Sequence, residues 1–247
     1  MKLSIVIAIL NSHEIVRRQY LHFARMGLPD DVEIIFVDDG SHPPLEPPKI
    51  KSFTMLYTYD KRQWTTGIAR NIGARHAKGE YLLMTDIDYI IPRAAIESAR
   101  NLTENKMGFR REFGVLDEHG NLTQDLDVLR KWGLTEDRIK SRGTKLAPHP
   151  NNFVMRADTF WKLGGYREDR MNEGYPKCTD DGAFKIRWTK LLDSGGATIQ
   201  DANLRPTLYM FPSGQYCGDV DYNPYDMFHN LTRKTKENYW YAKNMSN

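Results

Sequence analysis

Residues 3–40 read LSIVIAILNSHEIVRRQYLHFARMGLPDDVEIIFVDDG, and their pattern indicates the fold class. The stretch begins and ends with near-continuous apolar, β-branched runs, which are typical of parallel strands covered on both faces. Between the runs, residues 13–27 have the periodicity of an amphipathic helix and end at Gly27, a common helix terminator. We therefore expect a strand–helix–strand unit, the building block of α/β proteins.

The same alternation continues through the first hundred residues. The predicted elements are a strand at 53–59, a helix at 65–79, a strand at 80–86 and a helix at 91–105. The first of these helices is expected to end on Gly79, and Pro92 suits the start of the second. This order extends the strand–helix–strand unit into a mostly parallel sheet.

The second half of the chain is less regular. Residues 107–149 are charged and weakly periodic, so we expect an insertion of surface loops and small strands there. Regular patterns return at 151–166, and a last strand is predicted at 206–211. The tail at 229–247 is basic and aromatic, which favours a helix packed on the core; contact with a membrane surface or an acceptor is the alternative.

Composition favours a soluble globular protein. Of the 247 residues, 40% are hydrophobic and 27% are charged, which suffices for a large core and argues against disorder. The net charge of +3 is too small to indicate a nucleic-acid-binding protein. No run reaches the roughly 18–20 apolar residues of a membrane span, and residues 1–14 lack the features of a signal peptide. With only Cys178 and Cys217, we expect no disulfide framework and a cytoplasmic location.

Pairs of acidic residues end two of the predicted strands. Asp38 and Asp39 end the second strand, and Asp86 and Asp88 follow the fourth. In an open α/β sheet, ligands bind at the carboxyl ends of the strands. Because residues two apart in an extended chain point to the same side, Asp86 and Asp88 could face one ion, and carboxylates suit Mg²⁺ or Mn²⁺. An acid-rich turn without a ligand is the alternative.

Five segments carry a family resemblance: SIVIAILNSHE, VEIIFVDDGS, GIARNIGARHAKGEYLLMTDID, NNFVMRADTFWKLGGYRED and TDDGAFKIRW. In order and spacing they resemble the family 2 glycosyltransferases with the GT-A fold. The resemblance implies a Rossmann-like, three-layer α/β/α fold with a mixed, mostly parallel central sheet. It also implies one GT-A domain over residues 1–247. The nucleotide-sugar-binding half would span 1–106, and the acceptor-binding half, with the insertion and the tail, would span 107–247.

By this resemblance, the donor site uses acids from both strand ends. Asp39 corresponds to the nucleotide-binding acid, with Asp38 beside it, and Arg70 of the ARN motif corresponds to a residue near the diphosphate. Asp86 and Asp88 correspond to the D-x-D motif of the family, which binds the donor ribose and a metal ion, Mn²⁺ or Mg²⁺. The sequence around Arg70 alone does not exclude an exposed helix residue, which is the alternative.

The TDD motif at residues 179–181 resembles the Thr-Glu-Asp signature of the family. By this correspondence Asp181 is the general base, which takes the proton of the acceptor hydroxyl during attack. Asp180 stands where the family has Glu, which leaves its role, such as acceptor binding, open. Either acid could instead cap the helix that follows, since Asp is a favoured N-cap residue.

Two further residues are candidates for the donor site. Some relatives bind the metal through a histidine near the C-terminus, which maps onto His229, although a lone histidine is more often a surface or core residue. Trp64 could stack on a base or a sugar, but packing against the sheet is the simpler interpretation.

Together these features predict a metal-dependent inverting glycosyltransferase that takes its sugar from a nucleotide sugar, with a UDP-sugar favoured. The acceptor would be a glycan, a small metabolite or a modified nucleic-acid base. The rival hypothesis is a catalytically silent GT-A domain that binds a nucleotide or a glycan as an interaction module. A nucleotidylyltransferase is disfavoured because the N-terminal region has no glycine-rich, lysine-containing phosphate loop.

Overall fold

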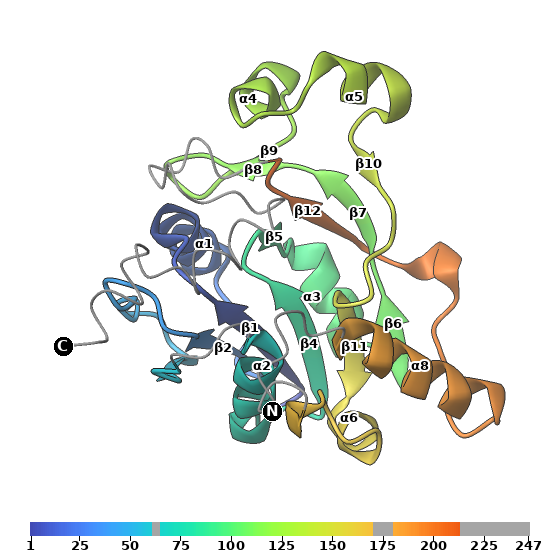
Figure 1. Ribbon diagram of the computed structural model, residues 1–247. Helices are drawn as coiled ribbons and strands as arrows, with labels where there is room; N and C mark the ends of the chain where they lie inside the picture. The colour runs from blue at the N-terminus through green and yellow to red at the C-terminus, as the bar shows by residue number, and fades with distance from the viewer. Residues whose placement is uncertain (61–64, 170–179, 213–247) are drawn as a thin grey trace.

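A six-stranded sheet forms the centre of the protein (Figure 1). The computed structural model describes residues 1–60, 65–169 and 180–212. The strand order is β3-β2-β1-β4-β11-β6. The strands are β1 Leu3–Ile9, β2 Val32–Asp38, β3 Phe53–Tyr57, β4 Tyr81–Asp86, β6 Lys106–Gly108 and β11 Phe153–Arg156. The first four strands run parallel, and β11 lies antiparallel between β4 and β6, so the sheet is mixed and mostly parallel, as expected.

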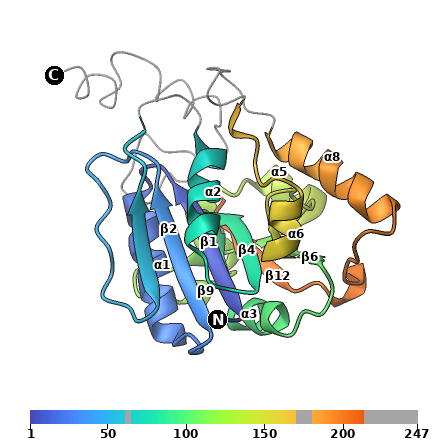
Figure 2. The same cartoon turned by 90° about the horizontal axis from the view of Figure 1, so that it is seen from below.

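Helices cover both faces of this sheet, which gives three layers (Figures 1 and 2). The covering helices are α1 His13–Met26, α2 Thr66–His76, α3 Arg93–Arg100, α6 Ala157–Lys162 and α8 Asp180–Asp193. Apolar residues of α1 and α3 share one core cluster with alternate strand residues. Those of α2, α6 and α8 share a second cluster on the opposite face. Because side chains alternate along a strand, one strand such as β1 contributes to both clusters.

The region predicted as loops and small strands is more ordered than expected. It contributes β6 to the main sheet and β7 Arg110–Phe113, β8 Val115–Leu116, β9 Leu122–Thr123 and β10 Lys145–Leu146 outside it. A second sheet has the order β10-β7-β12-β5, in which β5 is Tyr89–Ile90 and β12 is Thr207–Met210. A short 3-10 helix, η1 Ala202–Leu204, precedes β12.

Two short helices in this region, α4 Leu126–Lys131 and α5 Glu136–Arg142, were not predicted. Both begin at a side-chain cap: Asp125 accepts a hydrogen bond from the Val128 amide, and Thr135 accepts one from the Arg138 amide. Their one or two turns are too short for a clear apolar period, so the caps are the stronger signal.

The predicted role of Gly79 as a helix cap is wrong. Helix α2 ends at His76, and Ala77 follows it in an extended conformation. Gly79 instead passes close to β1: its amide donates to Ser4 Oγ at 2.8 Å, and a Cβ there would lie 2.5 Å from the Ser4 amide nitrogen. The glycine is therefore needed for close backbone approach rather than for ending the helix. Within the described ranges, no helix has both the length and the apolarity needed to cross a membrane.

Candidate active site

The acid pair after β4 lies at the carboxyl edge of the central sheet. Asp86 ends β4 and is half-buried, whereas Asp88 is only 6% exposed. The backbone carbonyl of Asp88 accepts a hydrogen bond from the Phe211 amide at 3.0 Å, which fixes this turn against the end of β12. Burial and the negative charge of Asp86 raise the pKa of Asp88 to about 8. Burying two neighbouring carboxylates is unfavourable unless a cation compensates their charge. A solvated acid-rich turn would not carry this cost, so the burial of Asp88 favours a metal site over such a turn.

Arg70 connects this acid pair to the second half of the chain. It lies on α2, is 4% exposed, and forms an ion pair with Asp86. Its Nη1 atom lies 3.6 Å from Oδ1 of Asp181, and its guanidinium carbon lies 5.4 Å from the ring centre of Tyr166. Burial alone would lower the pKa of Arg70, but the nearby carboxylates outweigh burial and raise it. Arg70 is therefore a permanent buried cation between two acids, not an exposed helix residue.

Asp181 lies in the first turn of α8, where its carboxylate faces the site. Burial raises the pKa of Asp181, whereas Arg70, His149 and a hydrogen bond from Asn151 act in the opposite direction. Asp180 is the first residue of α8. The side chain of Asp180, like Trp64 and His229, lies outside the part of the chain that the structure describes.

Aromatic packing fixes α8, and with it Asp181, on the sheet. The ring of Phe184 stacks on Phe153 of β11 with centroids 5.4 Å apart, and on Tyr166 with centroids 5.2 Å apart. From the next turn of α8, Arg187 Nη2 donates to the carbonyl oxygen of Gly165 at 2.5 Å. These contacts explain how a helix that begins at residue 180 can reach an arginine on α2.

Asn71 holds the Gly-Gly-Tyr turn beside Arg70. Its Oδ1 accepts a hydrogen bond from the Tyr166 amide at 2.9 Å, and its Nδ2 donates to the Tyr166 carbonyl at 2.8 Å. Gly165 has a φ of +59°, in the left-handed region, and a Cβ there would lie 2.8 Å from Asn71 Oδ1. The turn thus requires glycine both for its backbone angle and for the approach to Asn71.

The acids after β2 make different contacts. Asp38 accepts hydrogen bonds from the amides of Ser41 at 2.7 Å and Leu45 at 2.9 Å, so its carboxylate holds the following loop. Asp39 accepts from Thr65 Oγ1 at 2.8 Å and from Thr58 Oγ1 at 3.1 Å. Asp39 therefore connects the end of β2 to the start of α2.

These acids share one edge of the sheet with the D-x-D pair. In the sheet register, Asp38 lies opposite Ile9 of β1, and Asp86 lies opposite the neighbouring Ala8. Asp38 and Asp86 are thus two strands apart, about 10 Å.

Three residues that the sequence did not single out face the acids. His149 and Asn151 precede β11, and Arg111 lies on β7. Burial lowers the pKa of His149, although the carboxylates of Asp86 and Asp181 oppose this. Arg111 donates to the Tyr89 hydroxyl, and its charge opposes the rise in the Asp88 pKa. The sequence did hold a signal for His149 and Asn151, because both are polar residues just before the strand at 153–156. That strand begins at the sheet edge where Asp86 lies.

The protein residues that could hold a metal are few. In residues 1–60, 65–169 and 180–212, no group of three or more His, Cys, Asp or Glu side chains is arranged to hold one. Asp86 and Asp88 remain as a pair whose mutual repulsion a divalent cation would relieve, and this donor set fits Mn²⁺ or Mg²⁺. Both ions commonly complete their coordination with water and substrate phosphate oxygens.

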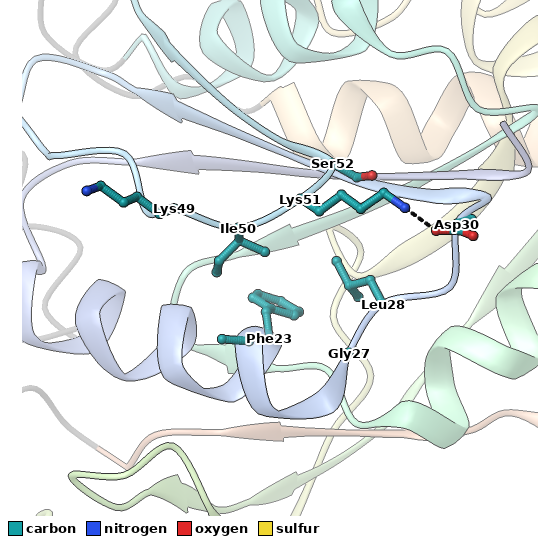
Figure 3. Close-up of a pocket in the computed structure, with 9 residues that line it drawn as sticks. Phe23, Gly27, Leu28, Asp30, Lys49, Ile50, Lys51 and Ser52 are labelled. Atoms are coloured by element: carbon teal, nitrogen blue, oxygen red, sulfur yellow. Dashed lines mark hydrogen bonds and ion pairs between the residues drawn. The ribbon is translucent and has the colours of Figure 1, made fainter.

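A cavity of about 330 Å³ lies away from these residues, at the opposite edge of the sheet (Figure 3). Its walls come from the end of α1 and from residues 49–52, and the Lys51–Asp30 ion pair of 2.6 Å lies at its rim. None of the candidate site residues lines it.

Comparisons with known proteins agree with this geometry. The profile of glycosyl transferase family 2 matches residues 4–164. Among curated proteins, none matches the chain. The fold is similar to that of S. aureus TarS 1–349, with a TM-score of 0.54 and 15% sequence identity, over 94% of this chain and 64% of that one.

Two ligand-bound structures are also similar. S. aureus TarS 1–349 in complex with UDP-GlcNAc has a TM-score of 0.53 and 13% identity over 85% of this chain and 58% of that one. The mannosyltransferase PcManGT from Pyrobaculum calidifontis, in complex with GDP-Man and Mn²⁺, has a TM-score of 0.51 and 19% identity, over 85% and 56% of the two chains. The chain thus spans less than two thirds of each of these proteins. With a family match over more than half of its length, the chain belongs to glycosyl transferase family 2, and it has the GT-A fold.

Proposed function

We propose that this chain is a metal-dependent, inverting glycosyltransferase that transfers a sugar from a nucleotide sugar to an acceptor hydroxyl. The observation that carries this proposal is the network in which buried Arg70 contacts both Asp86 and Asp181. It brings the acid of the D-x-D motif and the candidate base to the same cation. A transferase needs this proximity because the leaving diphosphate and the attacking hydroxyl meet at one carbon atom.

The donor is assigned to the edge between β2 and β4. We assign Asp39 to the nucleotide, with Asp38 shaping the loop beside it, and Asp86 to the donor ribose and the metal. The similar structures were determined with UDP-GlcNAc and with GDP-Man, which supports a nucleotide-sugar donor here. A UDP-sugar is the first donor to test.

The metal is assigned to Asp88 and Asp86. When bound, Mn²⁺ or Mg²⁺ would supply positive charge to the diphosphate that leaves. Arg70 lies on the same side and can donate hydrogen bonds to phosphate oxygens, as arginine commonly does. His229, the candidate third protein ligand, lies outside the described residues.

Asp181 is assigned as the general base. Its carboxylate takes the proton of the acceptor hydroxyl while the acceptor oxygen bonds to the anomeric carbon and the bond to the diphosphate oxygen breaks. A single attack from the side opposite the leaving group inverts the anomeric centre. Burial raises the pKa of Asp181, and Arg70 opposes that rise, which favours the ionised form that a base requires. For Asp180 we propose acceptor binding or helix capping.

A silent binding domain is the second candidate. It is favoured by the ion pair between Arg70 and Asp86, which already compensates one acid without any ligand. Such a domain would bind nucleotide but would not turn it over.

A donor screen separates the two functions. The purified protein is incubated with UDP- and GDP-sugars and Mn²⁺, Mg²⁺ or EDTA, and release of the nucleoside diphosphate is measured. We expect at least one donor to release its nucleoside diphosphate, and we expect this release to stop in EDTA. Release should be slower in Asp181→Asn and unchanged in the control Asp193→Asn, at the other end of α8. Donor binding without release from any sugar nucleotide would support the silent domain. Turnover that persists in EDTA would contradict metal dependence.

A further inference from the structure

Lys106 is enclosed by aromatic rings beneath α8. Its Nζ atom lies 4.7 Å from the ring centre of Phe153 and 4.8 Å from that of Trp188. Its neighbour in β6, Met107, points into the core on the other face of the sheet, so Lys106 points towards α8. Contacts of this kind offset part of the cost of burying an ammonium group.

Two further cations lie around Lys106. Arg205 passes over Gly108, the next residue of β6 on that face, and a Cβ on Gly108 would lie 3.6 Å from Arg205 Nε. Lys185 is an exposed residue of α8, and its charge acts on Lys106 together with that of Arg205.

The position of Arg205 is fixed by the backbone on both sides of it. The amide of Gln200 donates to the carbonyl of Lys106 at 2.9 Å, and the amide of Arg110 donates to that of Pro206 at 2.9 Å. The backbone of Arg205 is therefore held beside β6 by the fold.

This cation cluster, Lys106, Lys185 and Arg205, lacks an acid. Among the residues that the structure describes, none of the three forms an ion pair, and the buried Nε of Arg205 has no hydrogen-bond partner. Burial and the two neighbouring charges lower the pKa of Lys106 to about 8. Three like charges gathered at a partly buried place repel each other, and a bound anion would reverse that cost.

The cluster extends along α8 from the candidate base. Asp181, Lys185 and Trp188 are spaced four and three residues apart on α8, so they share one face, and each turn advances about 5.4 Å. On the sheet, Lys106 pairs with Met155, which pairs with Leu82, four residues before Asp86. The cluster is thus two strands from β4, about 10 Å, on the side away from β2 and the assigned nucleotide.

We propose that Lys106, Lys185 and Arg205 bind an anionic group, a phosphate or a carboxylate, that belongs to the acceptor. Assigning the anion to the acceptor rests on the proposed function, whereas anion binding by the three cations does not. The spacing of Asp181 and Lys185, one turn apart on α8, suits an acceptor whose reacting hydroxyl and charged group are on the same or adjacent units.

Binding of inorganic phosphate tests the cation cluster directly. Calorimetric titrations are made without donor or metal, at constant ionic strength set with chloride, on the wild type, Lys106→Met, Lys185→Gln and Lys190→Gln. Lys106→Met keeps an unbranched apolar side chain against the rings, and Lys185→Gln changes an exposed residue, so both should fold. Lys190→Gln removes an exposed charge elsewhere on α8 and serves as the matched control.

We expect Lys106→Met and Lys185→Gln each to weaken phosphate binding by about tenfold or more, and Lys190→Gln to bind as the wild type does. Equal affinities in all four proteins, or no phosphate binding by the wild type, would overturn the site. Phosphate held only by Arg70 would give the first of these results.

A glycan array then identifies the source of the anion. It compares neutral glycans with counterparts that carry phosphate or carboxylate groups. Retention of charged glycans by the wild type, lost in Lys106→Met, supports the acceptor assignment. Binding of inorganic phosphate but of no charged glycan would overturn that assignment. Because neither experiment uses a donor, failure of the donor screen would leave both results intact.

Discussion

Arg70 Nη1 lies 3.6 Å from Oδ1 of Asp181, although 110 residues separate the two in the sequence. The same guanidinium pairs with Asp86. One buried cation therefore contacts an acid from each half of the chain. This relationship makes the roles of the individual residues testable.

The first prediction concerns Asp181. Asp181→Asn should lower transfer by about 10²- to 10⁴-fold, because a general base contributes a factor of that size. Donor affinity should change little, since the residues assigned to the donor are untouched. Transfer and calorimetric donor binding are measured on the same preparation, with Asp193→Asn as the control. Near-normal transfer would mean that Asp181 only caps α8, because Asn caps about as well as Asp.

A second prediction concerns the pH dependence of turnover. Arg70 lowers the pKa of Asp181, so Arg70→Met should raise it. A base acts in its ionised form, and kcat/KM rises as the pH rises through its pKa. The acidic limb of the profile should therefore move to higher pH by about 1 unit or more in Arg70→Met. Arg70→Lys, which keeps the charge, should move it less, and the exposed Arg75→Met should not move it at all. A limb that stays in place in Arg70→Met would separate Asp181 from catalysis.

The third prediction concerns metal binding. Asp88→Asn should weaken binding of Mn²⁺ in the absence of donor, as measured by calorimetry, because it removes one of the two carboxylates. The metal-free variant should unfold at the same or a higher urea concentration than the wild type, since burial and Asp86 disfavour an ionised Asp88 and asparagine is neutral. A variant that binds Mn²⁺ normally would move the metal to other residues.

The turn held by Asn71 gives a fourth prediction. Asn71→Ala leaves the buried amide and carbonyl of Tyr166 without their side-chain partner, which should cost about 2–4 kcal/mol of unfolding free energy. Urea unfolding measures the loss, and Ser141→Ala, on an exposed helix, is the control. Activity should fall as well, because Tyr166 packs on Arg70. Unchanged stability would show that the turn holds its position through the aromatic packing alone.

Lys106 gives a fifth prediction, about stability at alkaline pH. Its pKa is about 8 in the folded protein, against about 10.4 for an unfolded lysine. Between these values the unfolded chain binds more protons, so the contribution of Lys106 to the free energy of unfolding rises with pH. Between pH 7.5 and pH 10 in phosphate-free buffer, the free energy of unfolding of the wild type should rise by about 1–3 kcal/mol relative to that of Lys106→Met. Lys190→Met should show no such difference relative to the wild type. Parallel curves for wild type and Lys106→Met would show that the ammonium is not perturbed by its surroundings.

Sequence patterns predicted the first half of the fold well, because its elements are defined locally. The runs that form β1, β2 and β4 are continuous and apolar, and the helix between β1 and β2 ends at Gly27 as expected. Gly79 shows the limit of such reading, because a glycine at a helix end and a glycine at a close backbone contact look the same in sequence.

The site was predicted only in part, because its assembly is not local. The family resemblance pointed to Arg70, Asp86 and Asp181, but their contact depends on β11 lying antiparallel beside β4 and on aromatic packing beneath α8. No periodicity encodes that arrangement. His149 and Asn151 escaped attention for the same reason, since their stretch has no regular pattern.

The pairing of Gly108 with Phe153 has a consequence for how this chain could diverge. The chain between them leaves the central sheet after Gly108 and re-enters it at Phe153, directly opposite on the adjacent strand. Residues 109–152 are therefore an insertion whose two ends lie side by side. Lengthening such an insertion costs little loop-closure entropy, about 0.6 kcal/mol for each doubling of its length. Residues 109–152 could therefore be exchanged as a cassette between related proteins, provided that the new segment keeps the strand that pairs with β12 and the apolar residues that join the core. The recipient would keep Arg70, Asp86 and Asp181 and would receive new side chains at the positions of His149, Asn151 and Arg111.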